Sequence, residues 1–95
     1  MKMILNGKTY NTDTMTILVE QSRYSGGNNY CGSDSIRVTV KGTYAFVFTS
    51  NGEDLYRCDY IEAIDKAEIS AKIDGWDIDD DQCATLLERG IVTEA

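Results

Sequence analysis

Three runs of β-branched and aromatic residues fill the middle of the chain, between Ser35 and Ile61, and predict the centre of the fold. The dipeptides Lys41-Gly42 and Asn51-Gly52 separate these runs, and glycine accepts the positive φ that tight hairpin turns require. We therefore predict a three-stranded antiparallel meander with strands at residues 36–41, 43–50 and 54–61.

The register of the first two strands depends on the turn at Lys41-Gly42. A two-residue turn pairs Arg37 with Phe46 and builds a basic, aromatic face of a kind that can stack bases: Arg37, Lys41, Tyr44 and Phe46. A three-residue loop places the aromatic residues beside Ile36 and Val38 instead, because a slip of one residue exchanges the faces. The sequence leaves both registers open, although its acidic total favours a face covered by helices over a nucleic-acid platform.

Alternating residues before the meander predict a small hairpin over residues 2–10, with Asn6-Gly7 as its turn. The next segment, residues 11–21, fits two structures. Met15, Leu18 and Val19 have helical spacing, with Thr12 or Asp13 as a cap, whereas Met15, Ile17 and Val19 alternate as in a strand. We predict a short helix over residues 13–22 and leave the strand as the alternative.

Two short helices are predicted after the meander, each from its capping residues. Asp65 and Glu68 have the spacing of a capping box and predict a helix over residues 66–74 that ends at Gly75. Asp79, with Gln82 three residues later, predicts a second helix over residues 80–89. The order of elements indicates an α+β fold, and a length of 95 residues indicates a single domain over residues 1–95.

Residues 22–34 contain three glycines and two asparagines and are predicted to form a loop. A long loop in a small domain is often functional, so its two aromatic residues, Tyr24 and Tyr30, are candidates for contact with a partner. The simpler interpretation, which we favour for isolated aromatic residues, is that they pack against the sheet.

Charge divides the chain into two unlike halves. The formal net charge is −7, and residues 1–52 hold three acids against five bases, whereas residues 53–95 hold thirteen acids against four bases. Such a balance repels phosphates at long range and attracts basic surfaces. We therefore expect a protein partner and no direct contact with nucleic acid.

The residue types present favour an interaction protein over an enzyme. Histidine is absent, which removes the commonest general base and metal ligand. The three cysteines lack the short spacings of zinc or redox sites. We read them as reduced thiols of a cytoplasmic protein, with Cys58 and Cys83 in the core and Cys31 in a loop as the thiol to test for reactivity. No apolar run approaches the length of a membrane span, and no leader is expected.

One spacing imitates a metal site. Asp77, Asp79, Asp81 and Glu88 occupy positions 1, 3, 5 and 12 of a calcium loop. The sixth position requires glycine but holds Gln82, and the predicted helix keeps Glu88 away from a loop-bound ion. We therefore interpret the acids as helix caps and a solvated face, and predict no metal and no cofactor.

The opening stretch of residues 4–14, Ile-Leu-Asn-Gly-Lys-Thr-Tyr-Asn-Thr-Asp-Thr, resembles the start of small proteins of phages and mobile elements, some of which are anti-CRISPR inhibitors. A Lys-Gly-x-Tyr hairpin, here residues 41–44, and an acidic helical tail, here residues 65–90, extend the resemblance over most of the chain. Residues 23–34 and 15–19 depart from that pattern. The resemblance implies an inhibitor without catalytic residues.

These observations lead to one hypothesis and one alternative. The hypothesis is a small cytoplasmic inhibitor that resembles a nucleic acid in charge and binds the basic groove of a bacterial nucleic-acid-processing effector. Its predicted partner-binding residues are Asp74, Asp77, Asp79, Asp80 and Asp81, together with Tyr24 and Tyr30. The alternative is a non-enzymatic interaction module, or a homodimer, that uses a sheet edge or an aromatic face.

Overall fold

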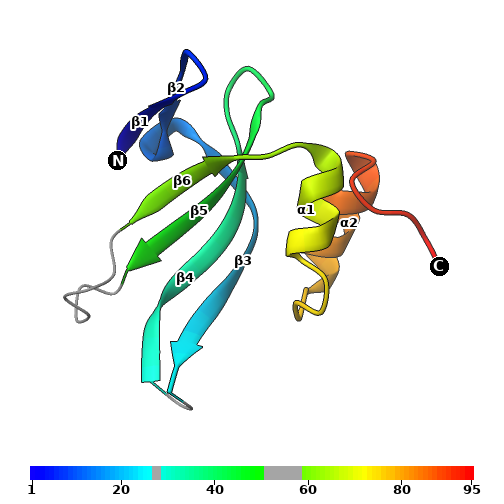
Figure 1. Cartoon of the computed structure of the whole chain (residues 1–95). Coiled ribbons are helices and arrows are strands. Elements are labelled where there is room, and N and C mark those ends of the chain that lie inside the picture. Colours follow the sequence, from blue (N-terminus) through cyan, green and yellow to red (C-terminus); the bar gives the residue numbers. More distant parts are fainter. Residues whose placement is uncertain (27–28, 51–58) are drawn as a thin grey trace.

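The computed structural model describes residues 1–26, 29–50 and 59–95, and in this part the chain forms three layers (Figure 1). A four-stranded antiparallel sheet in the order β3-β4-β5-β6 occupies the middle. Its strands are Thr16–Ser25, Asn29–Val38, Tyr44–Ser50 and Tyr60–Ala63. One face carries the hairpin of β1 (Lys2–Leu5) and β2 (Lys8–Asn11), and the other carries the helices α1 (Lys66–Lys72) and α2 (Asp80–Glu88).

The predicted N-terminal hairpin is confirmed. Asn6 and Gly7 both have positive φ, 53° and 74°, which is the signature of the type I′ turn that suits a two-residue hairpin. Below the turn, Leu5 pairs with Lys8 and Met3 with Tyr10.

The helix predicted over residues 13–22 is wrong. A single turn of 3-10 helix, η1 (Thr12–Thr14), is capped by the Asn11 side chain and leads directly into strand β3. The register of β3 against β4 shifts between Ile17 and Val19, so that Leu18 is an extra residue in the strand. This bulge turns Leu18 toward the same core as Val19 and so reproduces the helical spacing of Met15, Leu18 and Val19 in an extended chain.

The loop predicted over residues 22–34 is also wrong, because most of it belongs to the β3–β4 hairpin. A second register shift leaves Cys31 opposite no residue of β3, between the pairs Arg23–Gly32 and Tyr24–Tyr30. Gly32 has a φ of +152°, and a Cβ there would overlap the Phe48 ring and the Thr49 carbonyl oxygen. Glycine is therefore required by close packing inside a strand at this position.

The register of β4 on β5 is the one that the three-residue loop predicted. Val38 pairs with Tyr44 and Ile36 with Phe46, so the aromatic residues lie beside the apolar residues and Arg37 lies opposite Ala45. The basic, aromatic platform of the other register does not form. Of the third predicted strand, residues 60 and 61 fall in β6, while the turn at Asn51-Gly52 lies outside the described residues.

Both predicted helices are confirmed, with bounds one or two residues shorter at the C-terminal end. The Asp65 side chain accepts from the Glu68 amide and the Glu68 side chain accepts from the Asp65 amide, which is a complete capping box. The Asp79 side chain accepts from the Gln82 amide at the start of α2.

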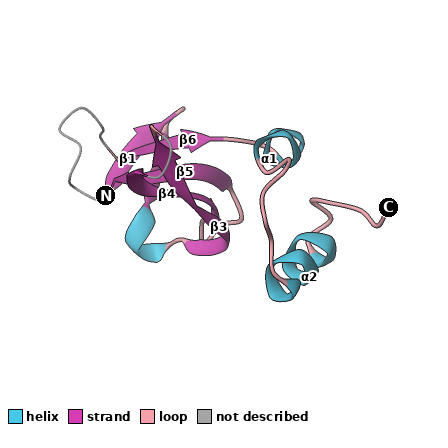
Figure 2. Ribbon diagram, turned by 90° about the horizontal axis from the view of Figure 1, so that it is seen from below, coloured by secondary structure: helices cyan, strands magenta, loops and turns pink. Residues whose placement is uncertain are grey.

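The two faces of the sheet bury separate apolar clusters. The face toward the helices holds the larger one, in which Ile36 and Phe46 of the sheet meet Ile69 of α1 and Leu86 of α2. The face toward the hairpin holds a smaller one around Tyr10, Ala45 and Val47. Viewed from below, the helices lie to one side of the sheet and leave part of it outside their cover (Figure 2).

Candidate functional surfaces

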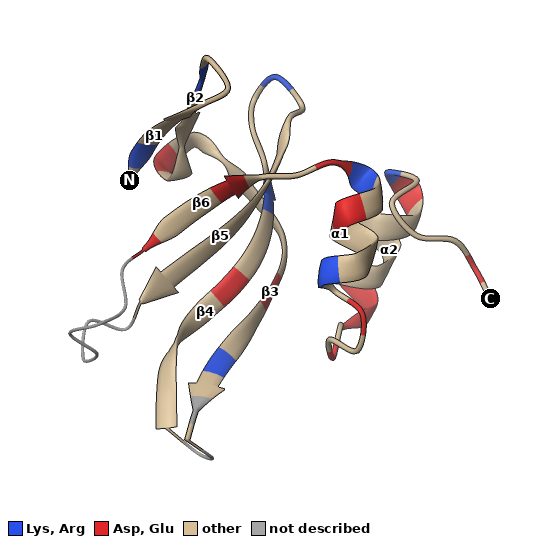
Figure 3. Ribbon diagram, viewed as in Figure 1, with Lys and Arg blue, Asp and Glu red and all other residues tan. Residues whose placement is uncertain are grey.

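Five aspartates gather where α1 leads into α2, and we call this surface the acidic end: Asp74, Asp77, Asp79, Asp80 and Asp81. All five are exposed. Acidic residues mark this connection and both helices, and basic residues mark β1, β2 and the β4–β5 loop but also both ends of α1 (Figure 3). The five predicted aspartates therefore lie on one short segment, between the end of α1 and the first turn of α2.

No aspartate of the acidic end forms an ion pair with any residue in the described part of the chain. Asp79 has a structural role, because its Oδ1 accepts from the Gln82 amide at 2.7 Å. Asp80 and Asp81 lie in the first turn of α2, where the helix dipole favours negative charge. The acidic end is thus held by local helix geometry, and most of its charge is left to solvent.

A shallow hollow of about 280 Å³ adjoins the acidic end between the two helices. Its lining includes Ile73, Ile78 and Cys83 next to Asp74. A partner that approaches the aspartates would therefore meet apolar surface beside them.

The two candidate tyrosines are exposed and paired with each other. Tyr24 is 58% exposed and Tyr30 is 45% exposed, and their ring centroids lie 5.9 Å apart in an edge-to-face arrangement. The Tyr30 hydroxyl also lies 3.2 Å from the Ser33 hydroxyl. The tyrosines belong to the end of the β3–β4 hairpin, so the structure does not place them in the acidic end.

Sequence reasoning missed a cluster of four residues on the part of the sheet beyond the helices. This sheet cluster consists of Arg23, Asp34, Phe48 and Tyr60. Arg23 donates to both carboxylate oxygens of Asp34, at 3.0 and 2.5 Å, and to the Tyr60 hydroxyl at 3.2 Å. Its guanidinium carbon lies 4.3 Å from the centre of the Phe48 ring, and Tyr60 stacks on the same ring at 5.6 Å.

The electrostatics of the sheet cluster follow from this geometry. The hydrogen bond to Asp34 raises the pKa of Arg23 above its ordinary value, against a smaller lowering by burial. Arg23 thus joins Asp34 and Tyr60 through hydrogen bonds, and Phe48 is only 1% exposed beneath them. The sheet cluster therefore covers a part of the sheet against which no helix packs. No local sequence pattern predicts this cluster, because Arg23 and Asp34 are 11 residues apart in a stretch that is predicted to be a loop.

The exposure of Cys31 and Cys83 is the opposite of what the sequence predicts. Cys31 is buried, 3% exposed, and its thiol donates to the Arg23 carbonyl oxygen at 3.4 Å. Cys83, which was predicted to fill the core, is exposed on α2. Cys58 lies outside the described residues.

Within residues 1–26, 29–50 and 59–95, no three or more Asp, Glu or Cys side chains are grouped as they would be around a metal ion. The calcium-like spacing falls across the start of α2, so that Asp81 and Glu88 lie about two turns apart on one helix. No helix in the described chain has the length and apolar character needed to cross a membrane.

Comparison with known proteins adds no relative: no family model, curated protein or solved structure matches the chain.

Proposed function

We propose that this chain is a small non-enzymatic inhibitor of the anti-CRISPR kind, active in the cytoplasm of the host cell. Its acidic end binds a basic surface of a bacterial nucleic-acid-processing effector, where the nucleic acid would otherwise lie. The observation that carries this proposal is the cluster of five exposed aspartates without an ion-pair partner in the described part of the chain.

Exposed charge of this kind acts mainly on the rate at which the two proteins associate. Unpaired carboxylates on one side of a small protein attract lysine and arginine grooves over about 10 Å at physiological salt. Complementary charge raises the association rate and excludes wrong partners more than it raises affinity. The neighbouring hollow at Ile73 and Ile78 offers apolar contact once the partner has docked.

A matched pair of triple variants tests the proposal. The first changes Asp77, Asp80 and Asp81 to Asn. The second removes the same number of charges from exposed acids elsewhere, with Asp13→Asn, Glu20→Gln and Glu94→Gln. Each is expressed in bacteria with an active CRISPR system, and plasmid or phage survival is measured.

We expect the wild type and the second variant to protect the target, and the first variant to lose protection. Capture of the effector from lysate should weaken at high salt for the same reason. Equal protection by both variants, or capture that is indifferent to salt, would contradict the proposal.

A second function is favoured by a separate observation. β3 is an edge strand of the sheet and is hydrogen-bonded only to β4 within it, so its outer side can pair with another strand. This would make the chain an interaction module or a homodimer. Light scattering after size exclusion decides the homodimer version, because a monomer at every concentration would remove it.

A further inference from the structure

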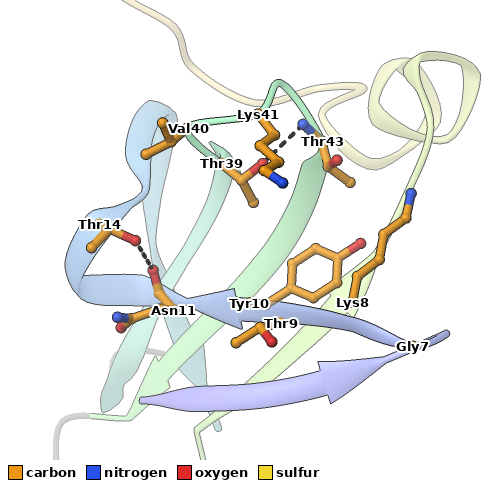
Figure 4. A pocket seen from close by; sticks show the side chains of 10 residues that line it. All are labelled: Gly7, Lys8, Thr9, Tyr10, Asn11, Thr14, Thr39, Val40, Lys41 and Thr43. Carbon is orange, nitrogen blue, oxygen red and sulfur yellow. Dashed lines mark hydrogen bonds between the residues drawn. The ribbon is translucent and has the colours of Figure 1, made fainter.

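Strand β2 and the loop between β4 and β5 border a half-open cavity of about 650 Å³ (Figure 4). This is within the range of 300–1,000 Å³ that is usual for small-molecule sites. Residues of the hairpin line one wall, and Thr39, Val40, Lys41 and Thr43 line the other. The cavity lies at the basic part of the chain and shares no lining residue with the acidic end.

The lining of this cavity is cationic and rich in hydroxyl groups. Lys8 and Lys41 both border it, and its lining contains no aspartate or glutamate. Neither lysine forms an ion pair with another described residue. The remaining polar lining consists of amide and hydroxyl groups, from Thr9, Tyr10, Asn11, Thr14, Thr39 and Thr43. In a protein with a net charge of −7, this concentration of cations without a carboxylate is a local exception.

Tyr10 adds a hydroxyl group to the lining of this cavity. The residue is only 2% exposed, and its ring packs in the cluster with Ala45 and Val47. Its hydroxyl points into the space between Lys8 and Lys41 (Figure 4). This oxygen is accessible to solvent, because no buried side-chain oxygen or nitrogen among the described residues lacks a hydrogen-bond partner, and the hydroxyl can therefore donate to a molecule inside the cavity.

Both walls are held by their own hydrogen bonds. In the loop, the Thr39 amide donates to the Thr43 carbonyl oxygen at 2.8 Å, and the Thr43 amide donates to the Thr39 hydroxyl at 3.0 Å. On the other wall, the Thr14 hydroxyl donates to the Asn11 carbonyl oxygen at 3.2 Å. The cavity is therefore preformed, which reduces the entropy lost when a ligand binds.

We propose that this cavity binds the phosphate monoester group of a small organic molecule. The dianion lies between the ammonium groups of Lys8 and Lys41 and accepts a hydrogen bond from the Tyr10 hydroxyl. Lysine serves as a point charge for phosphate, and two lysines match its double charge. A cavity of about 650 Å³ also leaves room for the organic part of the ligand, beside Val40. This site goes beyond the proposed inhibitor function and does not depend on it.

The test is a titration of the ¹⁵N-labelled protein followed by amide NMR shifts. The probes are adenosine 5′-monophosphate and glucose 6-phosphate, with uncharged adenosine and glucose as controls. We expect at least one monoester to give saturable shifts confined to residues 7–11 and 39–43, and the uncharged controls to give none.

Variants separate a built site from general charge. Lys8→Gln and Lys41→Gln should each raise the dissociation constant about tenfold. Tyr10→Phe, which keeps the ring, should raise it several-fold. Lys66→Gln removes the same charge from α1 and should leave it unchanged. The Asn triple variant of the acidic end should bind the monoester as the wild type does, so failure of this site is distinguishable from failure of the inhibitor proposal.

Three results would overturn the proposal. One is the absence of saturable shifts with both monoesters. Another is an equal response to sodium sulfate at matched ionic strength, which indicates general anion binding. The third is an effect of Lys66→Gln as large as that of Lys41→Gln.

Discussion

The sheet cluster and the acidic end both contain aspartate, yet they use it in opposite ways. Asp34 is only 7% exposed and accepts two hydrogen bonds from Arg23 above the buried Phe48 ring. The aspartates of the acidic end are exposed and have no ion-pair partner among the described residues. In the first region charge completes the packing of the sheet, and in the second it is exposed, although Asp79 also caps α2.

The difference shows that net charge alone does not identify a binding surface. The sequence predicts Asp34 in a loop together with Tyr30 and Cys31. In the structure its charge is instead neutralised by Arg23 inside the sheet. A charge is available to a partner only when the surrounding structure leaves it unpaired, as at Asp77. The following predictions measure this difference.

Replacing Phe48 should produce the largest effect. Phe48→Ala removes the ring on which Arg23 and Tyr60 stack, and we expect unfolding free energy to fall by about 3–5 kcal/mol. Chemical denaturation followed by circular dichroism measures it, and Phe48→Leu gives a milder version if the alanine variant does not fold. Tyr24→Ala removes an exposed aromatic ring from the same sheet and serves as the control. Equal losses for both would contradict the assigned role of Phe48.

Thiol labelling should distinguish the same two regions. Cys83 is exposed, whereas Cys31 is buried in the β3–β4 hairpin and can react only after this part of the sheet opens. We expect iodoacetamide to modify Cys83 at least about a hundredfold faster in native protein, since a closed structure protects a buried group by its opening equilibrium. Peptide mapping by mass spectrometry assigns each site. Equal rates in native protein would mean that the β3–β4 pairing opens easily.

Removal of the Asp34 carboxylate should cost less than removal of the ring. Asp34→Ala leaves a partly buried Arg23 without its main acceptor, and we expect a loss of about 1–3 kcal/mol. The comparison is Glu20→Ala, which removes an exposed acid from the neighbouring strand and should leave the denaturation midpoint nearly unchanged. A midpoint for Asp34→Ala equal to that of the control would show that the ion pair adds nothing to stability.

Within the acidic end, one aspartate should matter for stability and another should not. Asp79 caps α2, so Asp79→Ala should destabilise by about 1 kcal/mol. Asp77→Ala removes an exposed carboxylate without a hydrogen bond to the described residues and should leave the denaturation midpoint unchanged. Asp79→Asn should restore the stability, because asparagine caps as well as aspartate. A larger loss at Asp77 would show that the displayed charges also support the fold.

The elements that could be predicted are those with local causes. Asn6-Gly7 fixes its own turn through backbone conformation, and Asp65 and Asp79 fix the helix starts through hydrogen bonds that span three residues. The acidic end was found for the same reason, because its members follow one another between residues 74 and 81.

The elements that were missed have causes distant in sequence. The extra residue Leu18 in β3 gave a strand the spacing of a helix, and only pairing with β4 reveals the bulge. Gly32 indicated a loop, although it is required by the Phe48 ring of a neighbouring strand. The cavity that we propose for phosphate is lined by Lys8 and Lys41, which are 33 positions apart in the sequence, and so no local motif could predict it.

The two interruptions in the pairing of β3 and β4 have a consequence for how the protein behaves when concentrated. A long, flat outer strand is a template on which other chains assemble into fibrils, and irregular pairing twists such a strand away from that geometry. The uninterrupted stretch of β3 runs only from Val19 to Arg23, and it carries Glu20 and Arg23 as well. Stock solutions should therefore stay clear during storage, and deletion of Leu18, which would straighten the strand, should make them prone to aggregate.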